Sequence, residues 1–216
     1  MARRRRTAPG ESLAESVFLL AFDVRKQRLA GLSDLGYVVR AAVLAEFLLN
    51  GNVADEGGKV RALTPPVAPT ALEAAVWEQL SASPPRSWSR WINKNATLAY
   101  RLVRDELVAA RLVHVEHRRI LFFPVQRVTP RRPYVSRRLA ERVTSAARGG
   151  QPVGRLPQEL RALAALAAAA KMTTVLSQRE WRQYRKRTDE LSAPIEPITT
   201  ALRKTLASHH SSDAAG

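Results

Sequence analysis

The stretch of residues 36–51 constrains the fold more than any other part of the chain. It is long enough for a helix of about four turns and is apolar on nearly every side. Such a helix must be surrounded by other helices or by lipid, and this one is too short to span a bilayer and is interrupted by Arg40 and Glu46. We therefore predict a buried central helix that carries Arg40 near its N-terminal end and stops at Gly51.

The composition fits a soluble globule with an anionic partner. Of the 216 residues 45% are hydrophobic, which is enough for a real core, and the absence of cysteine excludes disulfides, thiolate metal sites and cysteine nucleophiles. We expect a cytoplasmic location. The net charge of +16, from 35 basic and 19 acidic residues, favours nucleic acid or an anionic membrane as the partner, although a basic surface with no function stays an alternative.

Three regions are predicted along the chain. Residues 1–11 form a basic arm that contains Arg3, Arg4, Arg5 and Arg6. A twin-arginine signal is rejected for this arm because the apolar run that follows is short, is flanked by acidic residues and has no cleavage site. Residues 12–207 form one helical domain, and residues 208–216 form a loose tail.

Capping patterns and apolar periodicity predict the helices of this domain. Ser12 with Glu15 has the spacing of a capping box, and two further boxes begin at Thr70 and Ser177. An amphipathic pattern marks the others. Beside the central helix, the predicted helices begin at 12, 70, 88 and 177 or cover residues 98–111, 131–148, 157–176 and 198–206.

Two β-hairpins are predicted between the helices. One covers residues 52–63 and turns at Gly57 and Gly58, and the other covers 112–128 and turns at His117-Arg118-Arg119. Residues 23–34 are expected to be a polar connection with a turn at Ala30-Gly31. The predicted fold class is therefore mainly α: a compact multi-helix globule around a buried central helix, with one or two short hairpins.

No pattern of catalytic or metal-binding residues stands out. The sequence lacks a nucleophile elbow, a P-loop and a dinucleotide fingerprint. His114 and Glu116 share a strand face, but no third ligand is indicated, so we predict no metal and no cofactor. Trp88 and Trp91 are interpreted as core anchors, with a membrane-interface role as the alternative.

Arg101 and Arg104 form the sharpest candidate site. They lie three residues apart on a predicted helix, so they share a face and can hold one phosphate between them. The competing interpretation is a solvated helix face. Several such clusters together with the net charge favour a phosphate-bearing partner.

Several stretches in this order resemble the Golgi phosphoprotein 3 family, in its bacterial branch. The resemblance covers about residues 12–206 and is carried by the order and spacing of the motifs. They are residues 13–23, 39–53, 101–107, 112–123, 135–143 and 160–166.

The resemblance implies an all-α fold with a projecting hairpin and a non-enzymatic protein that binds phosphatidylinositol 4-phosphate on membranes. By the family's motif, Arg40, Arg101 and Arg104 match the arginines of the headgroup pocket, and Gly31 stands where the family has a tryptophan. A bacterial member would bind an anionic or inositol phospholipid at the inner face of the membrane. Membrane contact is expected from the basic arm and from Arg118, Arg119 and Phe122 of the hairpin, which is also a candidate for homo-oligomerisation.

The alternatives are a nucleic-acid-binding protein and an interaction scaffold with an incidental basic surface. A helix followed directly by a hairpin with a basic turn is also the order of a winged helix-turn-helix. The predicted recognition helix, however, carries few side chains suited to reading bases. Nucleic acid is therefore the weaker expectation, and an enzyme is the weakest, because neither a nucleophile nor a metal site is indicated.

Overall fold

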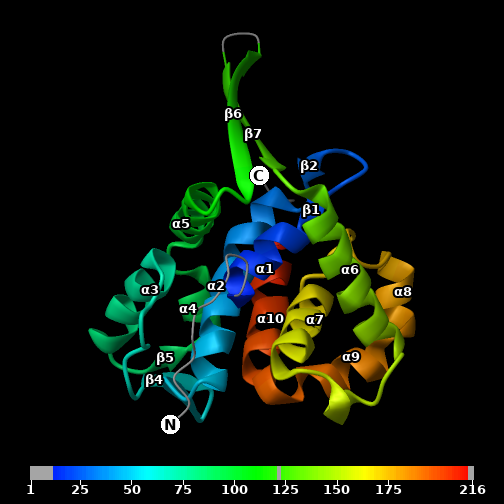
Figure 1. Cartoon of the computed structure of the whole chain (residues 1–216). Coiled ribbons are helices and arrows are strands. Elements are labelled where there is room, and N and C mark those ends of the chain that lie inside the picture. The colour runs from blue at the N-terminus through cyan, green and yellow to red at the C-terminus, as the bar shows by residue number, and fades with distance from the viewer. Residues whose placement is uncertain (1–11, 121–122, 214–216) are drawn as a thin grey trace.

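The structure is a computed structural model that describes residues 12–120 and 123–213. Helices dominate it and the sheets are small and antiparallel, which confirms the predicted mainly-α class (Figure 1). In chain order the helices and strands are α1 (Leu13–Leu20), β1 (Phe22–Asp23), β2 (Arg28–Leu29), α2 (Leu32–Leu49), β3 (Val53–Glu56), β4 (Lys59–Ala62), α3 (Ala71–Ser81), β5 (Arg86–Ser87), α4 (Trp88–Asn93), α5 (Ala96–Ala109), β6 (Val113–Ile120), β7 (Phe123–Pro130), α6 (Pro133–Arg148), α7 (Gln158–Ala169), α8 (Gln178–Gln183), α9 (Arg185–Ser192) and α10 (Glu196–Asp213).

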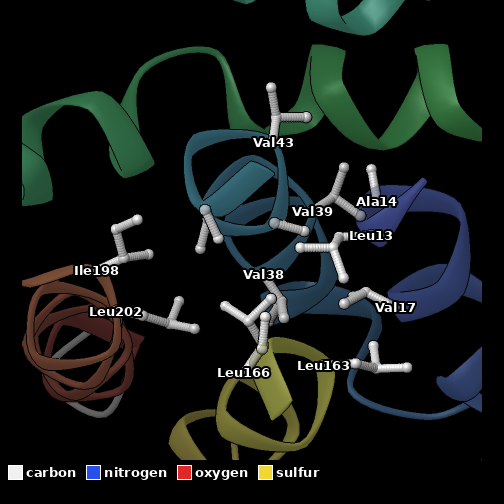
Figure 2. Packing of buried hydrophobic residues seen from close by; sticks show 14 of the residues in the cluster. Leu13, Ala14, Val17, Val38, Val39, Val43, Leu163, Leu166, Ile198 and Leu202 are labelled. Carbon is white, nitrogen blue, oxygen red and sulfur yellow. The ribbon is translucent and has the colours of Figure 1, made fainter. Parts of the chain in front are cut away.

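Helix α2 is the predicted central helix, and it is buried on every side. Helices α1, α4, α5, α7 and α10 all pack against it, and residues 38–47 are buried throughout (Figure 2). The helix ends as expected, with Gly51 in the left-handed region at φ 72°. It begins four residues earlier than predicted because Gly31, at φ 62° and ψ 39°, starts it from a left-handed conformation.

Alanines allow α7 to approach its neighbours closely. Residues 162–167 are all buried, between α1, α2, α6 and α10. The prediction of one helix over residues 157–176 was wrong, because α7 stops at Ala169. The amide of Met172 donates to the carbonyl of Ala167 at 2.9 Å, and Lys171 takes a left-handed φ of 48°, so a Schellman turn ends the helix.

The small sheets confirm the first hairpin and add strands that the sequence analysis missed. β3 and β4 pair around Gly57 and Gly58, both with positive φ, as the glycine pair predicted. β5 joins this hairpin as a third strand. Within the expected polar connection, β1 and β2 form a further small hairpin through two residue pairs.

The second hairpin exists, but its turn was predicted in the wrong place. β6 and β7 pair without interruption from Val113–Pro130 out to Ile120–Phe123, so His117, Arg118 and Arg119 lie within β6. These three residues therefore continue the strand. The ribbon projects from the helical body between α5 and α6 (Figure 1).

The last helix is longer than expected. α10 continues to Asp213, so residues 208–213 of the expected loose tail are helical. The reason is tertiary: Nε2 of His210 lies 2.9 and 3.0 Å from the two carboxylate oxygens of Asp34 at the start of α2. Helix α10 also packs along α2 and α4, with Ile198 and Leu202 facing the core (Figure 2).

Replacing Gly36 with alanine tests the close packing of α2 against α5. A Cβ there would meet the backbone oxygen of Ala96 at 2.4 Å, and backbone cannot move aside as a side chain can. We expect Gly36→Ala to lower the free energy of unfolding by about 3 kcal/mol in denaturant titrations. Gly154→Ala is the control, because its Cβ meets nothing within 4 Å, and we expect a change of at most about 0.5 kcal/mol. Equal stability of the two variants would contradict this packing.

Candidate functional site

Arg40 lies inside the protein and not on its surface. The residue is 1% exposed, and its Nε donates a hydrogen bond to the backbone oxygen of Trp91 at 2.7 Å. Its Nη1 reaches Oε1 of Gln79 at 3.4 Å, whereas its Nη2 is buried without a partner. Burial lowers the pKa of the guanidinium to about 10, so Arg40 still carries its charge at neutral pH. A ligand phosphate reaches Arg40 only if the groups that cover it move.

Arg101 and Arg104 lie on α5 but in different environments. Arg101 is exposed and has no partner among the described residues. Arg104 is only 16% exposed at its side chain, and its Nη2 lies 2.8 Å from Oδ1 of Asp105. Its Nη1 donates to Oε1 of Gln126 on β7 at 2.8 Å. To hold a phosphate together with Arg101, Arg104 must therefore exchange these partners for it.

Further arginines gather where the hairpin leaves the helical body. The amide of Arg131 donates to the oxygen of Leu112 at 2.8 Å, which joins the end of β7 to the end of α5. Arg111, Arg131 and Arg132 are exposed around this junction. Arg127 lies on β7, where its Nη2 donates to Oε1 of Gln27 at 3.4 Å. We call Arg104, Arg111, Arg127, Arg131 and Arg132 the hairpin-base cluster.

Exposed apolar and aromatic groups flank this cluster. Leu98 and Val108 on α5 are 43% and 39% exposed, and their spacing places them on the same helix face as Arg101 and Asp105. Tyr134, at the start of α6, is 53% exposed beside Arg132. Val108 and Tyr134 therefore lie near the two ends of the hairpin in sequence, whereas Leu98 lies in the first turn of α5, away from it.

Gly31 lines a cleft of about 520 Å³ in which Arg40, Arg101 and Arg104 take no part. The cleft lies between the start of α2, the loop after α7 and the C-terminal half of α10, and its volume suits a small ligand. We call it the α2–α7–α10 cleft. It is lined by Ala21, Ala30, Gly31, Asp34, Leu35, Val38, Ala169, Ala170, Lys171, Met172, Thr173, Thr174, Gln178, Arg203, Leu206, Ala207 and His210.

The sequence analysis missed this cleft. Lys171 was placed inside a long helix and His210 in a loose tail, so neither was considered a ligand contact. Their proximity depends on where α7 ends and how far α10 continues, and periodicity indicates neither. The one available signal was the β-branched pair Thr173-Thr174, which is unfavourable in a helix and hinted at its end.

The predicted membrane contacts lie mostly outside the described residues. This holds for Arg3, Arg4, Arg5, Arg6 and Phe122. Arg118 and Arg119 lie on β6, paired with Val125 and Pro124, but their side chains are outside the described part of the structure. Trp88 and Trp91 are 3% and 2% exposed, in agreement with their interpretation as core anchors.

Among the side chains that the structure describes, no group of three or more histidine, aspartate or glutamate residues is placed to hold a metal ion. Within residues 12–120 and 123–213, no helix is both long enough and apolar enough to cross a membrane.

Comparison with known families finds a match over most of the chain. The sequence model of the family described as Golgi phosphoprotein 3 (GPP34) matches residues 13–208. This range contains the central helix, the projecting hairpin and every residue that lines the α2–α7–α10 cleft except His210. A search among curated proteins finds no match.

Paired substitutions at Arg40 test whether this residue is packed in the core. Arg40→Met and Arg40→Ala both remove the charge, but only alanine leaves a cavity. We expect Arg40→Ala to be less stable than Arg40→Met by about 2–5 kcal/mol in denaturant titrations. The same pair at exposed Arg101 is the control and should differ by less than about 0.5 kcal/mol. If the two Arg40 variants were equally stable, Arg40 would not be enclosed.

Proposed function

This chain belongs to the Golgi phosphoprotein 3 family, and from that premise we propose that it is a non-enzymatic peripheral membrane protein that binds anionic phospholipid headgroups. The proposed location is the cytoplasm, at the inner face of the membrane. The preferred lipid is phosphatidylinositol 4-phosphate or a headgroup of similar charge. The observation that carries the proposal is the hairpin-base cluster, which combines five arginines with exposed apolar groups at one end of the molecule.

The chemistry of this surface suits a lipid interface. Arginines near an anionic bilayer each contribute about 1 kcal/mol, and a net charge of +16 adds a general attraction. Leu98, Val108 and Tyr134 supply groups that bury in the headgroup region, where tyrosine is favoured. The projecting hairpin would contact the same membrane through Arg118, Arg119 and Phe122, with Arg3–Arg6 adding a nonspecific attraction.

The arginines have different proposed roles. Arg101 is available for a phosphate, and Arg104 would join it by releasing Asp105 and Gln126. Arg40 would contribute a buried positive charge, which a headgroup reaches only after the groups that cover this side chain move. Gly31 lines the α2–α7–α10 cleft, which Arg101 and Arg104 do not line. We therefore favour the α5 site over Gly31 as the headgroup contact.

The order α5–β6–β7 favours nucleic-acid binding as a second candidate, because it is also that of a winged helix-turn-helix. The exposed face of α5 argues against it. This face carries Leu98, Val108 and Asp105 beside Arg101, and Arg104 is engaged by Asp105 and Gln126. Apolar groups and a carboxylate are poorly suited to a recognition helix beside DNA phosphates.

Association of two copies through the hairpin is proposed in addition, and sedimentation velocity would detect it.

Vesicle co-sedimentation tests the α5 site. We expect selective binding to vesicles with phosphatidylinositol 4-phosphate over phosphatidylserine vesicles of equal surface charge. Replacing both Arg101 and Arg104 with alanine should weaken that binding roughly 30-fold, as expected for the loss of two cations at the surface.

The matched control is the double variant Arg179→Ala, Arg182→Ala. These arginines are also exposed and three residues apart, but they lie on α8, away from the hairpin (Figure 1). The control should keep most of the affinity. An equal loss in both double variants would reduce the interaction to general electrostatics. Binding to duplex DNA with a steep salt dependence and no vesicle binding would favour the second candidate.

A further inference from the structure

The α2–α7–α10 cleft combines apolar walls with a charged mouth. Leu35 and Val38 of α2 and Leu206 of α10 belong to the buried core and form the inner walls. Lys171 and Arg203 lie at the edge and are exposed. Apolar walls with a few convergent polar groups are typical of small-molecule sites.

The charges at the mouth favour an anion. The Lys171 ammonium has no partner among the described residues, and Arg203 donates only to the hydroxyl of Thr200, at 3.1 Å. The negative charge of Asp34 is engaged by His210, whose Nε2 contacts both of its carboxylate oxygens. Lys171 and Arg203 thus outnumber the Asp34 carboxylate, and they carry the charges that a ligand at this mouth would meet.

The backbone at Lys171 supports a role beyond packing. This residue ends α7 at φ 48°, a left-handed conformation that favours glycine and disfavours a residue with a Cβ. Lysine adopts it here at an energetic cost, and the residue lines the cleft. Strained residues of this kind concentrate at functional sites.

We propose that the α2–α7–α10 cleft binds a single-chain anionic amphiphile, a fatty carboxylate or an alkyl phosphate. Its acidic group lies between Lys171 and Arg203, and its apolar chain lies along Leu35, Val38 and Leu206. This site is separate from the proposed α5 site, because Arg40, Arg101 and Arg104 do not line it. The proposed cleft site therefore does not depend on binding of the chain to phosphoinositide vesicles.

Titration calorimetry on the full chain tests this site with decanoate and octyl phosphate below their micelle concentrations. We expect both compounds to bind saturably, with one molecule per chain. Their affinity should be at least about tenfold higher than that of inorganic phosphate or of uncharged decanol, because the acidic group and the apolar chain each contribute to binding. Binding of inorganic phosphate as tight as that of octyl phosphate would overturn the apolar half of the proposal. Binding of decanol as tight as that of decanoate would overturn the anionic half.

Lys171→Gly separates ligand binding from folding. Glycine relieves the left-handed strain, so we expect Tm to rise by about 2–4 °C while the affinity for decanoate falls about tenfold. A purely structural lysine would give the first change without the second. Arg203→Ala should weaken binding to a similar degree, whereas Arg179→Ala, Arg182→Ala should leave it unchanged. Unchanged binding in both Lys171→Gly and Arg203→Ala would overturn the proposal.

A bulky residue at the cleft locates the chain of the ligand. Ala207 is exposed on α10 and lines the cleft, while its exposed neighbour Ser208 does not. Ala207→Trp should abolish decanoate binding and Ser208→Trp should preserve it. The opposite result would place the ligand elsewhere. Retention of decanoate binding in Arg101→Ala, Arg104→Ala, with loss of vesicle binding, would separate this site from the membrane surface.

Discussion

The complete burial of α2 is the constraint on which the rest of the structure depends. A helix with apolar residues on all sides needs a partner on each side, and α1, α4, α5, α7 and α10 supply them. Small residues decide how closely they approach, as at Gly36 against Ala96 and along the alanines of α7. Of these helices, the C-terminal end of α7 and the C-terminal half of α10 meet the start of α2. The cleft lies at this meeting point.

The same packing determines what the arginines can do. Arg40 belongs to the central helix, so it is enclosed with it, and its charge is compensated only by the oxygens of Trp91 and Gln79. The surface arginines instead follow the hairpin, whose base is joined to α5 by the Arg131–Leu112 bond. The β1–β2 hairpin links the two regions. It packs against β7, where Arg127 reaches Gln27, and it leads through Gly31 into α2.

Local signals in the sequence predicted much of this fold. All three capping boxes form, at Ser12, Thr70 and Ser177, because each depends on residues three apart. Predictions failed where the signal was weak or distant. The C-terminal end of α7 and the position of the β6–β7 turn were predicted wrongly. The alanine-rich segment that contains α7 and the alternating segment that contains β6 continue their patterns without a residue that marks the end. Of the candidate site, the surface position of Arg101 was predictable from its helix, but the enclosure of Arg40 by Trp91 and Gln79 was not.

By itself, the sequence determined the fold class, the central helix, the charge of the protein and the family to which it belongs. These properties are carried by composition, by periodicity within a few turns and by the order of motifs along the chain. Only the tertiary structure decided which cations are available to a ligand. Arg104 is engaged by Gln126 and Asp34 by His210, across 22 and 176 residues of chain, while Lys171 and Arg203 meet at a cleft. The physical reason is that the availability of a charge depends on the groups packed around it, and these come from segments whose proximity no local pattern encodes.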